Sequence, residues 1–212
     1  MCGRYMITSS FEAMARLFEA EPGELGPEGI RPNVSPTEQV PVVLSHDGAR
    51  GIELMRWGFI PQWYKSPTAG PLLINARSEK IAERPAFKEA IRTSRCLLPA
   101  NGFYEWQGEK GARVPWVIHP AQGGLIAMAG LWREWRGPNG IIASVAIITC
   151  PANATLRPIH ERMPVLIEPE DHALWLGERG PGAAPLLRPA AEERLVAVEA
   201  NPETKAILGR RG

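Results

Sequence analysis

Residues 95–149 read RCLLPANGFYEWQGEKGARVPWVIHPAQGGLIAMAGLWREWRGPNGIIASVAIIT, and this stretch decides the fold class. Apolar, aromatic and β-branched residues recur in five short runs between turn residues, which is typical of consecutive strands. The expected strands are 95–98, 102–107, 114–119, 124–132 and 141–149. Because strands joined by short turns pair antiparallel, the sequence predicts an α+β fold with helices packed outside the sheets.

The rest of the chain mixes helical and extended patterns. Residues 9–20 predict a helix, since their apolar side chains share one face and Ser9 with Glu12 fits a capping box. Residues 78–93 are helical by composition, although Pro85 should kink or restart that helix, and a short helix is expected at 170–176. Residues 21–36 are rich in Pro and Gly and predict a loop. Further strands are expected at 40–45, 51–60, 72–75, 165–167 and 195–198.

Length and composition are those of an ordinary globular protein. Of 212 residues, 44% are hydrophobic and 22% are charged, and no composition break divides the chain. We therefore predict a single domain over residues 1–212. No run approaches the roughly 18 apolar residues of a membrane helix, and the first residues lack the pattern of a secretory signal. We expect a cytoplasmic protein with no membrane partner.

Cysteine spacing and net charge exclude several classes of site. Cys2, Cys96 and Cys150 lie far apart without a CxxC pair, which argues against a disulfide framework and against a zinc ribbon. We expect no metal and no cofactor. The formal net charge of +1 gives little long-range attraction for nucleic acid, so any DNA binding must come from a local group of basic residues.

Cys2 is the most informative residue of the sequence. A small residue after the initiator permits removal of Met1, which leaves an α-amino group and a thiol on one residue. With ordinary pKa values of about 8 and about 8.5, both groups are partly nucleophilic near neutrality. Such an aminothiol condenses with an aldehyde and closes a five-membered thiazolidine. Position alone equally fits a cysteine without a role, or the nucleophile of an N-terminal hydrolase.

Three further segments carry candidate chemistry. In 72–79 an apolar strand leads to Asn75, which could orient a carbonyl, and Arg77, which could bind a phosphate; capping and a surface ion pair are the alternatives. Glu105 lies among aromatic residues, and its burial would raise its pKa and make it a general acid or base, whereas an edge strand would leave it in water. His160 lies in a short segment between prolines with arginines nearby, which favours a neutral imidazole.

An aromatic pair at Trp63 and Tyr64 is followed by Lys65. Exposed aromatic rings beside cations can stack on nucleobases or wedge between them, although aromatic residues more often belong to the core.

Several stretches, taken together and in this order, resemble the SRAP (SOS response-associated peptidase) family of abasic-site-capturing proteins. Each motif is short, and it is the ordered set over about residues 1–167 that is specific. The stretches are MCGRY (1–5), RPNVSPT (31–37), WGFIP (57–61), INARSE (74–79), RCLLP (95–99), GFYEW (102–106) and IHERMP (159–164). Beyond about residue 169 the match fades.

The resemblance implies a single SRAP-like domain, with mainly antiparallel sheets curled around a core, and a set of catalytic residues. Cys2, freed of Met1, would form a thiazolidine with C1′ of an abasic site in single-stranded DNA. Asn75 would hold the opened sugar and the terminal amine, and Glu105 would shuttle protons. His160 would assist sugar ring opening and reversal of the cross-link. An abasic-site lyase side activity is also expected, because an imine that fails to close can eliminate the 3′ phosphate.

The resemblance also implies a DNA-binding face. One domain with a DNA groove needs no partner subunit, so we expect a monomer. Tyr64 replaces what is often a second Trp, which leaves the geometry of the aromatic wedge open. The expected DNA-binding residues are Arg4, Asn33, Pro36, Trp63, Tyr64, Arg77, Ser78, Thr149 and Arg162.

Two other classes of protein remain open on the sequence. A thiol peptidase could use Cys2 with His160 and Asn75 as a triad, and glutamine amidotransferases also begin Met-Cys-Gly, although we find no substrate-carboxylate residues for that class. A non-catalytic protein that binds single-stranded DNA would use the same basic and aromatic face, and Cys2 would have no role.

Overall fold

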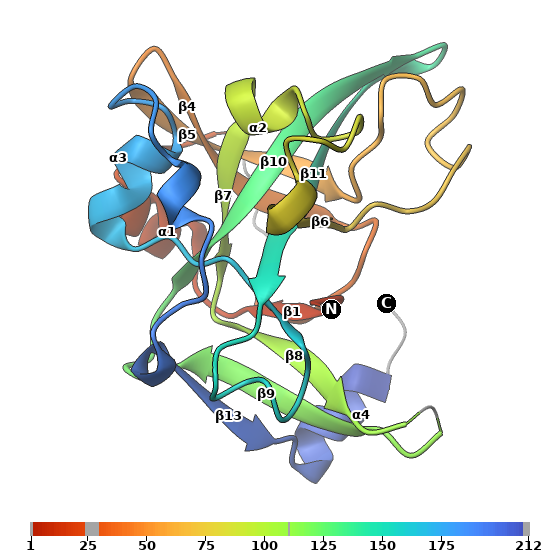
Figure 1. Cartoon of the computed structure of the whole chain (residues 1–212), viewed down its shortest axis with the longest axis vertical. Helices are drawn as coiled ribbons and strands as arrows, with labels where there is room; N and C mark the ends of the chain where they lie inside the picture. Colours follow the sequence, from red (N-terminus) through yellow and green to blue (C-terminus); the bar gives the residue numbers. More distant parts are fainter. Residues whose placement is uncertain (1, 24–29, 110, 210–212) are drawn as a thin grey trace.

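Two β-sheets with short helices around them form the fold (Figure 1). The computed structural model describes residues 2–23, 30–109 and 111–209. The strands are β1 (Tyr5–Ile7), β2 (Glu21–Pro22), β3 (Arg31–Val34), β4 (Gln39–His46), β5 (Ala49–Trp57), β6 (Asn75–Arg77), β7 (Arg95–Ala100), β8 (Gly102–Gln107), β9 (Val114–Pro120), β10 (Ile126–Gly137), β11 (Gly140–Pro151), β12 (Arg162–Pro164) and β13 (Leu195–Glu199). The α-helices are α1 (Phe11–Phe18), α2 (Ala90–Thr93), α3 (His172–Trp175) and α4 (Pro202–Gly209), and the 3₁₀ turns are η1 (Ser78–Lys80), η2 (Pro169–Asp171), η3 (Ala184–Leu186) and η4 (Glu192–Arg194).

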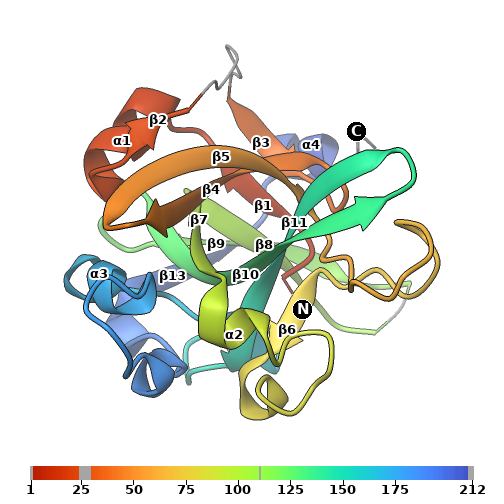
Figure 2. The same cartoon turned by 90° about the horizontal axis from the view of Figure 1, so that it is seen from above.

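The larger sheet has the strand order β12-β11-β10-β7-β4-β5-β2, with β6 paired to β11, and the smaller has the order β13-β9-β8-β1-β3. Most neighbours are antiparallel, but β11 also runs parallel to β5 and to β6. Figure 2 shows the larger sheet curving over the smaller one, with β1 and β8 beneath it. The sheet edge at which β11, β6 and β12 meet therefore lies close to β1.

The core fills the space between the sheets. Tyr5 of β1 and Trp57 of β5 are both 0% exposed, and their rings meet edge to face with centroids 5.1 Å apart. The indole N–H of Trp57 donates to the carbonyl of Ile74 at 3.0 Å, which fixes the segment leading into β6. Burying such aromatic side chains supplies much of the hydrophobic stabilisation, and here it also fixes the strand that begins at Tyr5.

The predicted α+β class is confirmed, and the five strands expected in residues 95–149 are β7 to β11. Residues 21–36 were predicted as a loop, but they contain β2 and β3; residues 24–29 lie outside the described residues. The predicted helix over 78–93 is wrong for most of its length: only η1 and α2 are helical, because Pro85 lacks an amide hydrogen and its ring excludes a continuous helix.

The helix predicted at residues 9–20 is confirmed as α1, with a different cap. Ser10, not Ser9, is the N-cap residue, and its hydroxyl accepts from the amide of Ala13 at 3.3 Å. Helix α4 was not predicted, because its side chains lack an apolar face and none is buried.

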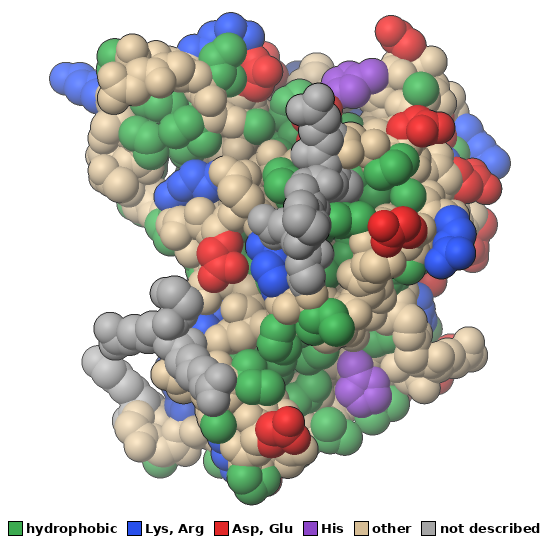
Figure 3. Space-filling view, turned by 180° about the vertical axis from the view of Figure 1, so that it is seen from behind, with side chains coloured by type: hydrophobic (Ala, Val, Ile, Leu, Met, Phe, Trp, Pro, Cys, Tyr) green, Lys and Arg blue, Asp and Glu red, His purple; other side chains and the backbone are tan. Residues whose placement is uncertain are grey.

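The surface is mixed in charge. On the face seen in Figure 3, acidic, basic and hydrophobic side chains are interspersed. In the part of the chain that the structure describes, every helix is too short or too polar to cross a membrane.

Candidate active site

The pairing of β1 with β8 places Cys2 beside Glu105. Tyr5 pairs with Phe103, and the amide of Tyr104 donates to the carbonyl of Arg4 at 2.9 Å. The strands are antiparallel, so residues before Tyr5 run along β8 toward Glu105. Cys2 is 1% exposed, and the charge of Glu105 acts on its thiol. The register of two strands thus assembles the first pair of predicted catalytic residues.

Glu105 is a buried carboxyl with a raised pKa. It lies on β8 between β1 and β9 and is 4% exposed, which confirms the predicted buried strand over the edge-strand alternative. Burial raises its pKa from 4.5 to about 7. A carboxyl with this pKa is present in both protonation states near neutrality, so it can accept and return a proton.

The environment of the Cys2 thiol differs from the expectation. Burial, and secondly the charge of Glu105, raise the pKa of this thiol well above its ordinary value. In this structure burial therefore favours the protonated thiol, whereas the sequence predicted a partly ionised thiol once Met1 is removed. A buried thiol needs a nearby base to become nucleophilic, and Glu105 is the carboxylate close to it.

Asn75 holds the backbone of Cys2. Its side-chain N–H donates to the Cys2 carbonyl at 3.0 Å, although the two residues are 73 positions apart. Its side-chain oxygen is buried and has no hydrogen-bond donor in the described structure. A buried acceptor without a donor costs about 1–3 kcal/mol. The amide thus anchors the N-terminal residue and retains an acceptor for a further donor.

His160 lies in a turn tied to the strand that carries Glu105. The side-chain N–H of Gln107, at the end of β8, donates to the carbonyl of Pro158 at 2.9 Å. The amide of Arg162 donates to Nδ1 of His160 at 2.9 Å. Nδ1 is therefore an acceptor, and the neutral imidazole carries its hydrogen on Nε2. Burial lowers the pKa of His160, which agrees with the neutral form predicted from the sequence, although burial and not neighbouring cations is the first cause.

The buried residues Arg162 and Thr149 form a cluster with the exposed Glu79. Arg162 is 7% exposed, and both terminal nitrogens of its guanidinium donate to the carboxylate of Glu79. Its Nη2 also donates to the carbonyl of Thr149 at 2.7 Å. This pairing lowers the pKa of Glu79 to about 2. Glu79 was singled out only as part of a motif, and the sequence alone gives no sign that it is the partner of Arg162.

The sheet brings Arg77 to the same cluster. In the register of β11, Thr149 pairs with Arg77 of β6 on one side and with Pro164 of β12 on the other. Arg77 is exposed, whereas Ser78 is half-buried and donates from its hydroxyl to Glu79 at 3.2 Å. The 3₁₀ turn η1, which begins at Ser78, has no side-chain cap.

Arg4 and Asn33 meet at the edge of the site. The guanidinium of Arg4 donates to the side-chain oxygen of Asn33 at 2.8 Å. The side-chain N–H of Asn33 in turn donates to the carbonyl of Ile207 in α4 at 3.0 Å. Pro36 lies half-buried in the turn between β3 and β4. Sequence reasoning missed the contact with α4, because nothing in a linear pattern relates residues 33 and 207.

Trp63 and Tyr64 lie in the loop between β5 and β6. Trp63 is 58% exposed, and the two rings meet edge to face with centroids 6.4 Å apart. The backbone carbonyl of Tyr64 accepts from the indole N–H of Trp135 at 2.9 Å, and the hydroxyl of Tyr64 donates to the carbonyl of Pro71 at 3.3 Å. Tyr64 is therefore held by the protein, and Trp63 presents its ring to solvent.

Replacing Glu105 by Gln is expected to change the pH dependence of stability. Since folding raises the pKa of Glu105 from 4.5 to about 7, the folded state binds the proton more tightly, and stability is lost as pH rises through this range. The rise in pKa corresponds to at most about 3.4 kcal/mol. Glu105→Gln should therefore be more stable than wild type at pH 8 and lose this advantage toward pH 5, as measured by urea unfolding. If the difference in the free energy of unfolding between variant and wild type is the same at pH 5 and pH 8, this would contradict a buried, proton-binding Glu105.

Within residues 2–23, 30–109 and 111–209, no three His, Cys, Asp or Glu side chains gather as a metal site. The side chains of the candidate site are the thiol of Cys2, the carboxyl of Glu105 with a pKa of about 7, the amide of Asn75 and the imidazole of His160.

This fold and this set of residues define a class of protein. The family model of the SOS response associated peptidase (SRAP) matches residues 1–206, and the chain belongs to this family. It is 33% identical over 184 residues to the abasic site processing protein YoqW of Bacillus subtilis (strain 168), covering 84% of this chain and 81% of that protein. It is 31% identical over 170 residues to the abasic site processing protein HMCES of Xenopus tropicalis, covering 66% of this chain and 51% of that protein.

Solved structures share the fold. A protein from Bacteroides thetaiotaomicron superposes with a TM-score of 0.87 at 24% identity, covering 99% of this chain and 100% of that chain. A phage-related protein from Bordetella bronchiseptica superposes with a TM-score of 0.76 at 27% identity, covering 94% of each chain.

Proposed function

We propose that this protein captures abasic sites in single-stranded DNA as a covalent thiazolidine on Cys2, after removal of Met1, and thereby shields the lesion in the response to DNA damage. The observation that carries the proposal is that the charge of Glu105, a buried carboxyl with a pKa of about 7, acts on the buried thiol of Cys2. The names of the relatives, abasic site processing proteins, support the same substrate.

The reaction joins an aminothiol to an aldehyde with loss of one water. The α-amine of Cys2 adds to C1′ of the ring-opened sugar, and protonated Glu105 gives its proton to the resulting hydroxyl, which leaves as water to give a protonated imine. The carboxylate of Glu105 takes the proton of the thiol, and the sulfur attacks the imine carbon, whose π electrons move to nitrogen. No oxidant or reductant is needed. The second step is intramolecular, which favours ring closure.

The geometry supports a separate task for each side chain. Asn75 fixes the Cys2 backbone through its amide N–H, and its unfilled side-chain oxygen can accept from the terminal amine or a sugar hydroxyl. His160 in its Nε2–H form can donate to a sugar oxygen while the ring opens. The same steps run backward would release the cross-link.

The thiol peptidase alternative fits the geometry less well. In a Cys-His-Asn triad the His takes the thiol proton and the Asn side-chain oxygen orients the His. Here Asn75 donates to Cys2, and Nδ1 of His160 is occupied by the amide of Arg162. The carboxylate whose charge acts on the thiol is that of Glu105.

The test is a mass measurement of the adduct. Wild-type protein mixed with abasic single-stranded DNA is expected to give a band that survives boiling in detergent. The mass of that band should equal the chain without Met1, plus the oligonucleotide, minus one water. A protein that retains Met1 yet forms the stable adduct would refute the aminothiol chemistry. Hydrolysis of a peptide or of glutamine without any adduct would favour the hydrolase class.

A further inference from the structure

His160 lies near the end of the loop of residues 152–161, which joins β11 to β12 of the larger sheet. Bonds within the loop shape it: the amide of His160 donates to the carbonyl of Leu156 at 3.0 Å. These bonds do not fix the distance from His160 to Glu105, because Glu105 lies on β8 of the smaller sheet. That distance depends on contacts between the loop and the smaller sheet.

Gln107 is a side chain of the smaller sheet that reaches this loop. Its side-chain N–H donates to the carbonyl of Pro158 at 2.9 Å, two positions before His160. Its side-chain oxygen accepts from the indole N–H of Trp116 at 3.1 Å. The nitrogen of the amide is used in one bond and the oxygen in the other, so a flipped amide would lose both. The orientation of the Gln107 side chain is therefore fixed.

The strand register puts this contact beside Glu105. Glu105 and Gln107 lie two positions apart on β8, so their side chains point to the same face of the sheet. Trp116 of β9 pairs with Glu105, so its indole belongs to that face as well. The bond between Trp116 and Gln107 thus lies on the face that carries the carboxyl of Glu105.

The charge of Arg113 shows that the end of the β8–β9 hairpin lies near both sides of this contact. Arg113 is exposed and directly precedes β9. Burial lowers the pKa of His160, and the charge of Arg113 lowers it further, whereas Glu161 acts in the opposite direction. The same charge opposes the rise in the pKa of Glu105 that burial causes. One cation therefore acts on residues of both sheets at the place where Gln107 joins them.

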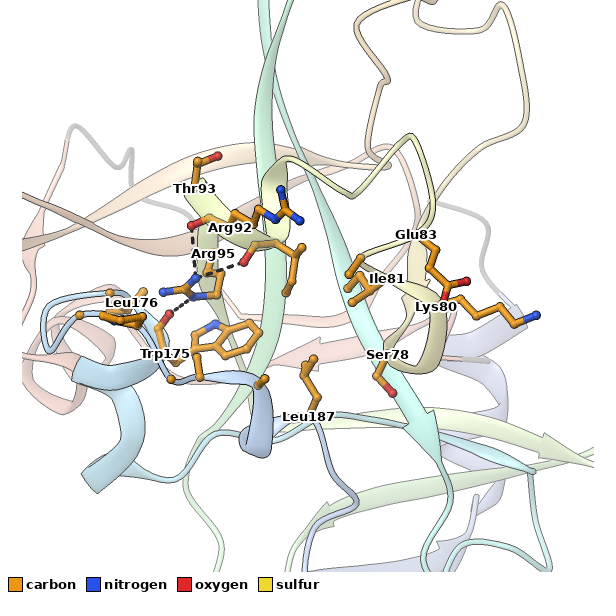
Figure 4. Close-up of a pocket in the computed structure, with 18 of the residues that line it drawn as sticks. Ser78, Lys80, Ile81, Glu83, Arg92, Thr93, Arg95, Trp175, Leu176 and Leu187 are labelled. Atoms are coloured by element: carbon orange, nitrogen blue, oxygen red, sulfur yellow. Dashed lines mark hydrogen bonds between the residues drawn. The ribbon is translucent and has the colours of Figure 1, made fainter.

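The start of the loop is held by a different part of the chain. The side-chain N–H of Asn153 donates to the carbonyl of Ala190 at 3.1 Å. Ala190 follows closely on Leu187, which lines a hollow of about 670 Å³ and lies between Trp175 and Ser78 in Figure 4. This anchor fixes the start of the loop, whereas Gln107 fixes the end that carries the imidazole.

We propose that Gln107 is a positioning residue for opening of the abasic sugar: through Pro158 it holds His160 at the distance from Glu105 at which both side chains reach the same sugar. This inference rests on the proposed function for the reaction. Ring opening breaks the bond between C1′ and O4′; O4′ gains one proton and the C1′ hydroxyl loses one, so the step is an isomerisation. A donor held at O4′ stabilises the charge that develops there.

The test compares adduct formation with two single strands. The first has a natural abasic site, whose sugar is mostly closed. The second carries an aldehyde on an acyclic linker, made by periodate cleavage of a vicinal diol, and needs no ring opening. Gln107→Leu keeps the size of the side chain and loses the donor. It should slow the reaction of the abasic strand about tenfold and that of the acyclic strand by less than about twofold, because misplacement of His160 affects only the first step.

A double-variant cycle shows whether Gln107 acts through His160. In a His160→Ala background, Gln107→Leu should add less than about twofold to the loss. Trp116→Phe keeps the ring but loses the N–H that orients Gln107, and should give a smaller loss of the same kind. Gln122→Leu, in the exposed turn after β9, is the matched control and should react at the wild-type rate. Equal slowing of both strands, or an undiminished loss in the His160→Ala background, would overturn the assignment.

A measurement without DNA separates this inference from the adduct chemistry. Since burial lowers the pKa of His160, loss of the bond from Gln107 should bring that pKa closer to its ordinary value, as measured by NMR titration of the imidazole in Gln107→Leu. An unchanged titration would refute the positioning role even where the adduct forms. If the titration changes but wild-type protein forms no adduct with either strand, the proposed function fails and the positioning of His160 by Gln107 stands.

Discussion

Cys2→Ala is expected to lower the yield of heat-stable adduct by about two orders of magnitude or more, because ring closure by the neighbouring sulfur is what stabilises the product. The α-amine remains in this variant, so the imine still forms and returns to the free aldehyde. Sodium borohydride should trap that imine as a secondary amine. Without ring closure, loss of a C2′ proton can expel the 3′ phosphate, so strand cleavage should increase while the adduct disappears. Gel analysis of protein-bound and cleaved strands measures both outcomes.

Cys96→Ala is the matched control for the loss of a thiol. Cys96 is also buried, but it lies on β7, where its side chain packs in the core. This variant should form the adduct at the wild-type level once its folding is verified by circular dichroism. An adduct that persists in Cys2→Ala and disappears in Cys96→Ala would reject Cys2 as the nucleophile.

Glu105→Gln should slow adduct formation by about a hundredfold to a thousandfold, since general acid–base catalysis contributes on this scale. The pKa of Glu105 is about 7, so its carboxylate becomes more abundant as pH rises through 7. If this carboxylate takes the thiol proton, the wild-type rate constant should rise up to about pH 7 and then level off. The Gln variant should lack this rise. Single-turnover rates between pH 5.5 and 8.5 provide the measurement.

A merely structural role of Glu105 predicts a different pattern. A single strand that carries a tetrahydrofuran abasic analogue has no aldehyde and cannot form the adduct, so it measures binding alone. If Glu105 is structural, Glu105→Gln should weaken binding of this strand and slow the reaction together. If Glu105 transfers protons, binding should be nearly unchanged. Glu105→Asp keeps a carboxyl and should recover part of the rate together with its pH dependence. Failure of the Asp variant to recover any pH dependence would count against proton transfer by this side chain.

The sequence predicted the sheet-forming half of the chain well and the loop-rich half poorly. Residues 95–149 follow local rules, because alternating apolar residues and turn residues specify neighbouring antiparallel strands. The segment 78–93 does not: its composition is helical, but Pro85 and the packing of Phe87 against Phe59 hold it in turns. Here tertiary contacts override composition, and a single sequence does not reveal them.

The candidate site was likewise predicted only in part. The identities of Cys2, Asn75, Glu105 and His160 came from motifs, and the burial of Glu105 was predicted from its aromatic neighbours. The sequence does not show which atoms form contacts. The hydrogen bond from Asn75 to Cys2 spans 73 positions, and that from Arg162 to Glu79 spans 83. The raised pKa of the Cys2 thiol likewise depends on burial by strands that lie far away in the chain.

The hydrogen bond from Asn33 to Ile207 joins positions 174 residues apart and supports the side chain that Arg4 contacts. During translation, Ile207 emerges from the ribosome long after Arg4. The strand β13, which pairs with β9, also forms late. A nascent chain therefore acquires the final arrangement around Arg4 only after residue 207 has emerged, so a product released before that point lacks this support of Arg4 even where Cys2 is already in place.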